Sequence, residues 1–422
     1  MGGLLRVATA GSVDDGKSTL VGRLLLDAKA VLADQWDAVE RASRRQGYDD
    51  ADLALLVDGL RAEREQGITI DVAYRYLSTP RRSFVLADTP GHVQYTRNTV
   101  TGMSTADIAV VLVDARSGLV EQTRRHATVA GLLGVGHVAL AVNKMDLVGF
   151  AEEVYDAVSA DFAGLAAARG IGSWSAVPVC AVDGDNLVEK SGRMPWYAGP
   201  ALLPLLESLP AVAPAADGVG ARLPVQLVVR PRSRAHPDYR GYAGRIAAGV
   251  LRTGDEVVVL PSGRTSTVAG IDTPDGELAE AAAGRSVVVR LADDLDVARG
   301  DVIAAPGTAP EVTRAVTATT CWLAEEPLAP GSRWRVRQAT RDVPGEVVAI
   351  GDRLDPSTGR MEAADRLDLN DLGTVTLRTN EPLVTDPYAR ARHTGSLLLV
   401  DPVTGGTAGA AVVLDPARLP GG

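Results

Sequence analysis

A glycine-rich loop set between a strand-like and a helical segment constrains the fold of this chain more than any other feature. The loop, Gly11-Ser12-Val13-Asp14-Asp15-Gly16-Lys17-Ser18, has the full spacing Gly-x-x-x-x-Gly-Lys-Ser. Residues 4–10 before it are apolar, and a helix is expected from about 17 to 26. Such a loop turns backbone N–H groups inward at the positive end of the following helix. This order of strand, loop and helix predicts a phosphate-binding loop. The alternative, a glycine-rich turn that arose by chance, would not account for the strand before it and the helix after it.

Lysine is rare in this chain, and its positions are informative. Lysine and arginine together number 43, but only Lys17, Lys29, Lys144 and Lys190 are lysines. Lys17 lies in the loop described above, and Lys144 lies in another motif of the nucleotide-binding type, Asn143-Lys144-Met145-Asp146. A compact ammonium reaches between phosphate oxygens where a planar guanidinium is too wide. We therefore expect Lys17 to bridge the β- and γ-phosphates and the Ser18 hydroxyl to ligate Mg²⁺.

A second motif, Asp88-Thr89-Pro90-Gly91, follows a predicted strand at 83–87. Asp88 is expected to hold Mg²⁺ through water, and the Gly91 N–H to sense the γ-phosphate. His92 comes next and can orient the attacking water; the alternative is an exposed loop histidine. Thr69 can bring its hydroxyl to Mg²⁺ and the γ-phosphate; the alternative is a β-branched strand residue. The predicted catalytic residues are Lys17, Thr69 and His92, and the predicted metal ligands are Ser18, Thr69 and Asp88.

A third motif, Asn143-Lys144-Met145-Asp146, ends the apolar strand predicted at 137–142. The Asp146 carboxylate can accept two hydrogen bonds from guanine N1–H and the 2-amino group, whereas adenine offers neither donor. Leaving such a carboxylate unpaired can cost on the order of 10⁴-fold, so the motif predicts GTP rather than ATP. Asn143 would fix the loop and Lys144 would lie over the base.

A short Cys180-Ala181 step follows the apolar segment Val177-Pro178-Val179. The Ala181 N–H could reach guanine O6, although an ordinary strand end explains these residues nearly as well. The complete predicted nucleotide-binding set is Gly11, Ser12, Val13, Asp14, Asp15, Gly16, Lys17, Ser18, Thr19, Asp88, Gly91, Asn143, Lys144, Asp146, Cys180 and Ala181.

Patterning predicts two kinds of architecture. Up to about residue 210, continuous apolar strands such as 108–113 alternate with helices, which predicts a doubly wound, mostly parallel sheet. Residues 27–66 are expected to be helical and 68–76 to form a strand. After a Pro/Gly-rich linker, short Val-rich strands alternate with turns and predict two small β-barrels. The expected domains are 1–210, 222–308 and 312–417, with the second barrel's strands starting near Ala315.

Bulk properties narrow the functional classes. The net charge of −10 argues against a large nucleic-acid footprint. Two cysteines cannot form a disulfide framework, so a reducing cytoplasm is expected. Neither a signal peptide nor a bilayer-spanning stretch is evident. Arginines at 230, 232, 234 and 240 could meet an acidic partner or nucleic acid, but a solvated barrel loop is favoured. Trp322 and Trp334 are expected to pack inside a barrel.

With these motifs in this order, the chain resembles the translation-factor class of GTPases. Within that class, residues 52–76, 194–200 and 369–373 are similar to the large subunit of bacterial sulfate adenylyltransferase. The resemblance covers nearly the whole chain. Relatives usually carry Ser where this chain has Cys180, and the segment 232–236 looks longer than usual.

The resemblance implies a GTP-hydrolysing regulatory subunit in a heterodimer or higher assembly with a small catalytic subunit. The small subunit transfers AMP from ATP to sulfate, giving adenosine 5′-phosphosulfate and pyrophosphate, and GTP hydrolysis is coupled to this uphill step. Some relatives carry a fused adenylylsulfate kinase, which is not expected here because no second phosphate loop is seen. The alternatives are an elongation factor delivering aminoacyl-tRNA and a GTP-sensing switch without a catalytic partner.

Overall fold

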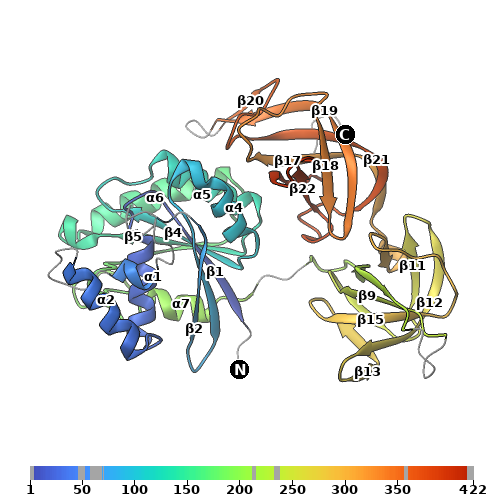
Figure 1. The fold of residues 1–422 in the computed structure, drawn as a ribbon. Coiled ribbons are helices and arrows are strands. Elements are labelled where there is room, and N and C mark those ends of the chain that lie inside the picture. Colours follow the sequence, from blue (N-terminus) through green and yellow to red (C-terminus); the bar gives the residue numbers. More distant parts are fainter. Residues whose placement is uncertain are drawn as a thin grey trace. The chain divides into compact units, whose positions relative to one another are not determined.

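The computed structural model describes residues 4–45, 53–57, 69, 71–211, 215–231, 238–355 and 360–415. The chain folds into two compact units, the first mainly Met1–Val212 and the second mainly Ala213–Leu354 with Met361–Gly422. The first is layered, with helices around a sheet, and the second is built of strands (Figure 1). The predicted fold class, an α/β domain followed by β-barrels, is confirmed.

The first unit is organised by a six-stranded sheet in the order β2-β3-β1-β4-β5-β6. Its strands are β1 (Leu5–Ala10), β2 (Ala73–Ser78), β3 (Ser83–Asp88), β4 (Ile108–Asp114), β5 (His137–Asn143) and β6 (Trp174–Pro178). Only β2 runs antiparallel to its neighbour. Strands β4 and β5 are buried along their whole length, as expected for parallel strands covered on both faces. The carboxyl ends of the parallel strands therefore meet at one edge of the sheet.

Helices cover both faces of this sheet. Apolar residues of α1 (Lys17–Asp27) and α7 (Leu202–Ser208) share a core with β1, β3 and β4. Helices α4 (Thr96–Ser104), α5 (Glu121–Leu132) and α6 (Glu152–Ala168) lie together on the other side (Figure 1). Helix α2 (Ala33–Arg45) and short 3₁₀ turns at 53–56, 93–95 and 145–148 complete the unit. Among the described helices, none is both long and apolar enough to cross a bilayer.

The region between α1 and β3 differs from its prediction. The segment 27–66 is not one helical stretch, because α2 begins only at Ala33 and the described residues 53–56 form a 3₁₀ turn. The strand expected at 68–76 begins at Ala73, although residues 68 and 70 lie outside the described part. Just before it, the Asp71 carboxylate accepts the Val72 N–H at 2.7 Å. This side-chain bond engages the Val72 N–H locally, and the ladder with β3 begins one residue later, at Ala73.

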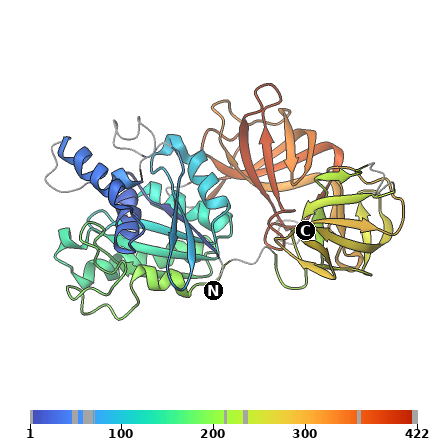
Figure 2. The same ribbon diagram turned by 60° about the horizontal axis from the view of Figure 1, so that its bottom comes forward.

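The second unit contains two large sheets and a two-stranded one and, among its described residues, no α-helix. Figure 2 shows them as two barrels, one green to yellow and one orange to red. The first barrel has the order β7-β16-β11-β12-β15-β9-β8, with β13 beside β12 and a separate β10–β14 pair. Its strands are β7 (Arg222–Pro224), β8 (Leu227–Val229), β9 (Gly241–Arg245), β10 (Val250–Arg252), β11 (Glu256–Leu260), β12 (Arg264–Thr273), β13 (Gly276–Leu278), β14 (Glu280–Ala282), β15 (Ser286–Leu291) and β16 (Val302–Ala304).

The second barrel has the order β18-β22-β23-β17-β21-β19-β20, and it closes because β18 also pairs with β19. Its strands are β17 (Glu311–Trp322), β18 (Arg333–Gln338), β19 (Arg341–Leu354), β20 (Met361–Ala363), β21 (Leu372–Thr385), β22 (Ser396–Val400) and β23 (Thr407–Val413). The first of them starts four residues before the predicted Ala315. Trp322 is fully buried, and its ring packs edge to face against that of Trp334 with 4.9 Å between the ring centroids. The prediction that these two tryptophans pack inside a barrel is confirmed.

A buried ion pair joins the two barrels. Arg222 of β7 is 2% exposed, and its Nε and Nη2 each lie 3.2 Å from a carboxylate oxygen of Asp386. Asp386 also accepts the Thr394 hydroxyl at 2.7 Å. Beside the pair, Val384 packs against the apolar ends of β11 and β16. The pair is therefore buried and hydrogen-bonded through both carboxylate oxygens.

Arg222→Met should strongly destabilise this contact, because Asp386 would remain buried without its counter-charge. We expect a loss of about 3–5 kcal/mol in equilibrium urea unfolding followed by circular dichroism. Arg252→Met is the matched control, since its 2.9 Å pair with Glu280 is exposed and should contribute less than about 1 kcal/mol. The double variant Arg222→Met/Asp386→Leu should recover much of the loss. Equal effects of the two single arginine variants would contradict a special role for the buried pair.

Candidate functional site

The phosphate-type loop lies where predicted, between the end of β1 and the start of α1 at Lys17. Gly16 has a φ of 90°, and a Cβ there would stand 2.5 Å from Asn143 Nδ2. Glycine is therefore required at this position by both its conformation and its close neighbour. Asn143 belongs to another motif 127 residues later, so the fold brings the two motifs into contact.

Lys17 is 6% exposed and reaches back over its own loop. Its ammonium donates to Ser12 O at 2.6 Å and to Gly11 O at 3.2 Å. Burial lowers the pKa of Lys17, while the charges of Asp88, Asp15 and Asp14 oppose this shift. A Cβ on Gly91 would lie 2.5 Å from Lys17 Nζ, so the Asp88–Gly91 turn sits directly against the ammonium.

The three predicted metal ligands lie together. The Ser18 hydroxyl donates to Asp88 Oδ2 at 2.7 Å and lies 3.2 Å from Thr69 Oγ1. Asp88 is fully buried, and its other oxygen accepts the Thr9 hydroxyl at 2.6 Å. These are hard oxygen groups of the kind that Mg²⁺ prefers. The donor set therefore fits Mg²⁺, and Thr69 lies at the site rather than in a strand.

The third motif ties the site together through one amide. Asn143 Nδ2 donates to Asp15 O at 2.7 Å, and Asn143 Oδ1 accepts the Ala181 N–H at 3.0 Å. The N–H that was expected to face guanine O6 is thus engaged by Asn143 in this structure. Asp146 is exposed, and Lys144 has a left-handed backbone with φ of 61°. The loop that carries both side chains is held by contacts to two other loops.

Cys180 is buried beside Asp146. Its thiol donates a hydrogen bond to Asp146 Oδ1 over 3.2 Å. Burial and the neighbouring acids raise the pKa of Cys180 to about 12. The side chain therefore stays a thiol at physiological pH and is a poor nucleophile and a poor target for oxidation.

A cavity of about 500 Å³ collects most of the predicted residues. Its wall includes Val13, Asp14, Gly16, Lys17, Ser18, Thr19, Thr69, Gly91, His92, Asn143, Lys144, Asp146, Cys180 and Ala181. The four predicted residues that do not line it are Gly11, Ser12, Asp15 and Asp88, which contact the wall through the hydrogen bonds given above. Exposed His92 lies at the cavity with its ring 6.3 Å from that of Tyr95.

Several residues at the site lie outside the sequence motifs and were not predicted from the sequence. Leu147 and Val182 line the cavity although their side chains are 54% and 65% exposed, and Ala54 also lines it. Behind the loop, the buried His126 of α5 accepts the Gly11 N–H at Nδ1 over 3.1 Å. Burial, and then the charge of Lys17, lower the pKa of His126 to about 3, so the ring is neutral and can accept. The only sequence signal for His126 was the rarity of histidine, with five in the chain.

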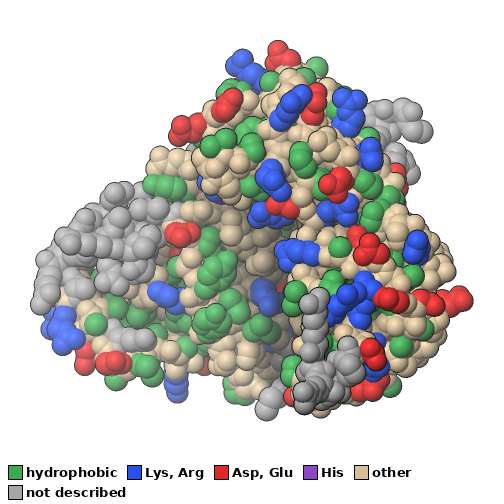
Figure 3. All heavy atoms as spheres, turned by 45° about the vertical axis from the view of Figure 1, so that its right-hand side comes forward, with side chains coloured by type: hydrophobic (Ala, Val, Ile, Leu, Met, Phe, Trp, Pro, Cys, Tyr) green, Lys and Arg blue, Asp and Glu red, His purple; other side chains and the backbone are tan. Residues whose placement is uncertain are grey.

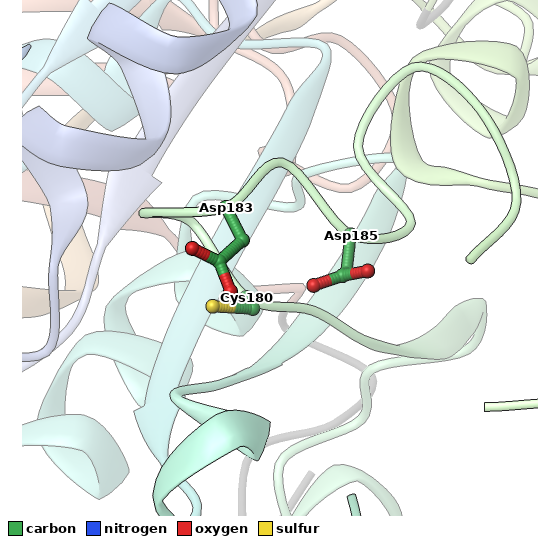
Figure 4. A group of neighbouring side chains, drawn as sticks. All are labelled: Cys180, Asp183 and Asp185. Atoms are coloured by element: carbon green, nitrogen blue, oxygen red, sulfur yellow. The ribbon is translucent and has the colours of Figure 1, made fainter. Parts of the chain in front are cut away.

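Cys180, Asp183 and Asp185 place three potential metal-binding atoms close together (Figure 4). Each of them already has a partner within the chain. The guanidinium of Arg193 pairs with both carboxylates, at 2.7 Å from Asp183, and the Cys180 thiol faces Asp146. Arg193 also stacks over the ring of Phe150 at 4.6 Å. Ion pairing therefore accounts for this cluster, which braces the loop after β6.

A larger cavity, of about 780 Å³, lies on the first barrel, where the arginine-rich loop was noted. Arg240 pairs with Asp294, and Arg290 pairs with Asp272 at 3.0 Å and Glu277 at 2.7 Å. Arg232 and Arg234 lie outside the described residues. On the face that Figure 3 shows, basic and acidic side chains are interspersed. Charges here are balanced, which favours the solvated barrel loop over an anion-binding surface.

Comparison with known proteins agrees with this geometry. Residues 3–215 match the family described as Elongation factor Tu GTP binding domain, and residues 315–414 match the GTP-eEF1A C-terminal domain-like family. Fold and site together thus define a GTP-binding protein of the translation-factor class. A solved structure described as sup35 complexed with GDP aligns over 98% of this chain and 94% of that chain, at 23% identity and a TM-score of 0.44.

Full-length relatives narrow the class further. "Sulfate adenylyltransferase subunit 1" of Laribacter hongkongensis is 50% identical over 97% of this chain and 85% of that protein. "Bifunctional enzyme CysN/CysC" of Mycobacterium tuberculosis is 54% identical over 97% of this chain and 67% of that protein. The chain belongs to the sulfate adenylyltransferase subunit 1 family.

Proposed function

We propose that this chain binds GTP with Mg²⁺ and hydrolyses it in the cavity at the carboxyl ends of the parallel strands. The observation that carries the proposal is the convergence of three separate motifs on that one cavity of about 500 Å³. Asn143 contacts the loop of Asp15 and the loop of Ala181 at once. Phosphate binding and base recognition thus share one framework.

At the base end, Asp146 accepts guanine N1–H and the 2-amino group, and Lys144 lies along the base. Asp146 is exposed and therefore accessible to a ligand. The Cys180 thiol donates to Asp146 Oδ1 and so helps to orient the carboxylate. Leu147 and Val182 are exposed apolar side chains in the cavity wall, and a purine ring would cover them. The Ala181 N–H reaches guanine O6 only by sharing its present bond to Asn143.

At the phosphate end, the loop N–H groups and Lys17 neutralise the β- and γ-phosphates. The Lys17 ammonium exchanges its bonds to Ser12 O and Gly11 O for phosphate oxygens. Gly91, which lies against that ammonium, senses the γ-phosphate with its N–H. His92 orients the attacking water from the cavity rim. Neutral His126 fixes the Gly11 end of the loop without adding a charge.

Ser18, Thr69 and Asp88 are proposed to hold Mg²⁺, with Asp88 acting through water. The bound ion would neutralise charge on the phosphate oxygens. The hydrogen bonds among these three side chains arrange them on one side of the cavity. Thr9, which bonds the other oxygen of Asp88, keeps that carboxylate oriented.

We propose further that this GTPase is the regulatory subunit of a sulfate adenylyltransferase. Its relatives are named as subunit 1 of that enzyme, which supports a partner subunit here. The partner would transfer AMP from ATP to sulfate, and GTP hydrolysis would be coupled to that step. Cys180 and Cys321 are both buried and form no disulfide, which supports a reducing cytoplasm. The 50% sequence identity to these subunits favours this role over delivery of aminoacyl-tRNA. The alternative is supported only by the class of the GTP-binding domain.

The deciding experiment measures GTP hydrolysis by the purified chain with and without the small subunit from the same genome, in the presence of ATP and sulfate. We expect stimulated hydrolysis together with formation of adenosine 5′-phosphosulfate. Hydrolysis that responds to ribosomes and aminoacyl-tRNA, but not to the small subunit, would move the protein to translation.

His92→Ala should slow GTP hydrolysis by about 10²-fold, because water would be less well oriented. GTP affinity should stay nearly unchanged, since the ring lies at the cavity rim. Single-turnover hydrolysis and equilibrium binding of a fluorescent GTP analogue separate the two effects. His393→Ala, at an exposed histidine of the second barrel, is the control. Weaker binding with normal turnover would count against water positioning.

A further inference from the structure

A buried carboxylate that belongs to none of the motifs lies beside the base-reading loop. Asp114 is the last residue of β4, is 6% exposed, and stands in register with Asn143 at the end of β5. The backbone continues this pairing, since the Ala115 N–H donates to Asn143 O at 2.9 Å. Asp114 therefore enters the site at the same edge of the sheet as the third motif.

The Asp114 carboxylate holds two cations. Arg116 donates to Oδ1 from its backbone N at 2.9 Å and from Nε at 3.0 Å, and to Oδ2 from Nη2 at 2.6 Å. The second oxygen also pairs with Lys144 Nζ at 3.0 Å. These contacts hold the pKa of Asp114 well below its usual range, with the bond from Arg116 as the largest cause. The carboxylate is thus charged at any working pH.

We propose that Asp114 is a positioning residue that fixes Lys144 over the nucleotide and thereby slows nucleotide release. This inference rests on the proposed GTP site. Arg116 clamps the carboxylate from the solvent side, and the carboxylate in turn holds the end of the Lys144 side chain. Lys144 lines the cavity, and its left-handed backbone already fixes where its side chain starts.

The physical reason is conformational entropy. A free lysine side chain carries about 2 kcal/mol of rotamer entropy, and a ligand that packs on it must overcome that loss. With both its backbone and its ammonium held, Lys144 has lost most of this freedom before the nucleotide arrives. The nucleotide then binds a preorganised surface, which mainly lowers the rate of release.

Charge balance adds to the effect. Burial is the main reason why the pKa of the phosphate-loop residue Asp15 is raised; the charge of Asp114 adds to this shift, and the charge of Lys144 opposes it. The charges of Asp114 and Lys144 therefore act in opposite directions on the loop. An isolated Lys144 ammonium would be free to turn toward Asp14, Asp15 or Asp146 instead of lying along the base.

The test is release of fluorescent GDP from the full chain, chased with excess unlabelled GDP. Asp114→Asn should accelerate release about 10-fold, and Lys144→Met should do so at least as strongly. In the double variant, Asp114→Asn should add nothing to Lys144→Met, because the carboxylate acts through that lysine. Asp161→Asn is the matched control: its 2.6 Å pair with Arg124 joins α5 to α6 away from the cavity, and release should not change.

A second variant, which keeps the net charge of the chain, controls for loss of folding stability. Asp114→Asn leaves Arg116 and Lys144 without their shared partner, whereas Asp114→Asn/Arg116→Gln removes the Arg116 charge as well, keeps the net charge of the chain, and should restore the melting temperature of the nucleotide-free protein. Release from this variant should still be about 10-fold faster than from the unmodified chain. Unchanged release, or full additivity with Lys144→Met, would overturn the inference while leaving GTP binding intact. Absence of GDP binding by the unmodified chain would instead overturn the proposed function itself.

Discussion

Lys17→Ala is expected to abolish GTP hydrolysis, with a loss of at least about 10²-fold. The ammonium is buried between the phosphate loop and the Asp88–Gly91 turn, where charge is screened little by water. Removing it leaves the γ-phosphate charge unneutralised as the transferring group separates. The variant should also lose the GTP-dependent gain in adenosine 5′-phosphosulfate synthesis. Both activities are measured with the small subunit, ATP and sulfate.

The chain offers a matched control in Lys190, whose ammonium also donates to a backbone carbonyl, that of Ala198 at 2.9 Å. Lys190→Ala removes the same side chain from an exposed position outside the cavity and should leave both activities intact. If Lys17→Ala hydrolysed GTP at the normal rate, the phosphate-loop assignment would be rejected.

Asp146→Asn should convert the preference for guanine into a preference for xanthine. An amide at this position can donate to the 2-oxo group of xanthine, and it loses the acceptor pair that matches guanine N1–H and the 2-amino group. We expect GTP binding to weaken by up to on the order of 10⁴-fold relative to XTP. Competition of GTP and XTP for a fluorescent nucleotide measures this ratio directly.

The control for base reading is Asp183→Asn, which changes an aspartate on the neighbouring loop. Asp183 pairs with Arg193 at 2.7 Å and does not line the cavity. Its substitution should preserve the preference for guanine. Persistence of normal GTP selectivity in Asp146→Asn would show that another group reads the base.

The residues that could be predicted from the sequence are those whose chemistry depends on local spacing. The loop from Gly11 to Ser18 and the tetrapeptide from Asn143 to Asp146 each carry their meaning within four to eight consecutive residues. In the structure the two segments lie together because they follow β1 and β5, parallel strands whose carboxyl ends meet at one edge of the sheet. Continuous apolar strands such as β4 likewise predicted the sheet itself.

The residues that were missed act through contacts that only tertiary structure creates. Asp114 looks like an ordinary strand end until register places it beside Asn143 and within 3.0 Å of Lys144. His126 reaches Gly11 across 115 residues, and nothing in its own helix signals that contact. The start of β2 was misplaced because β-branched residues around Thr69 have strand propensity, whereas tertiary contact with Ser18 holds Thr69 elsewhere.

The two bonds of Asn143 limit how this site can evolve. One amide side chain holds the loop that grips the phosphates and the loop that flanks the base, and Gly16 leaves no room for a bulkier neighbour. A substitution at position 143 would therefore remove contacts to both loops at once, and phosphate binding and base recognition would change together. Asp146 is exposed and tied to the framework only through its own loop and the Cys180 thiol. A change of nucleotide preference that leaves both loops in place is therefore expected from substitutions at position 146 rather than at position 143.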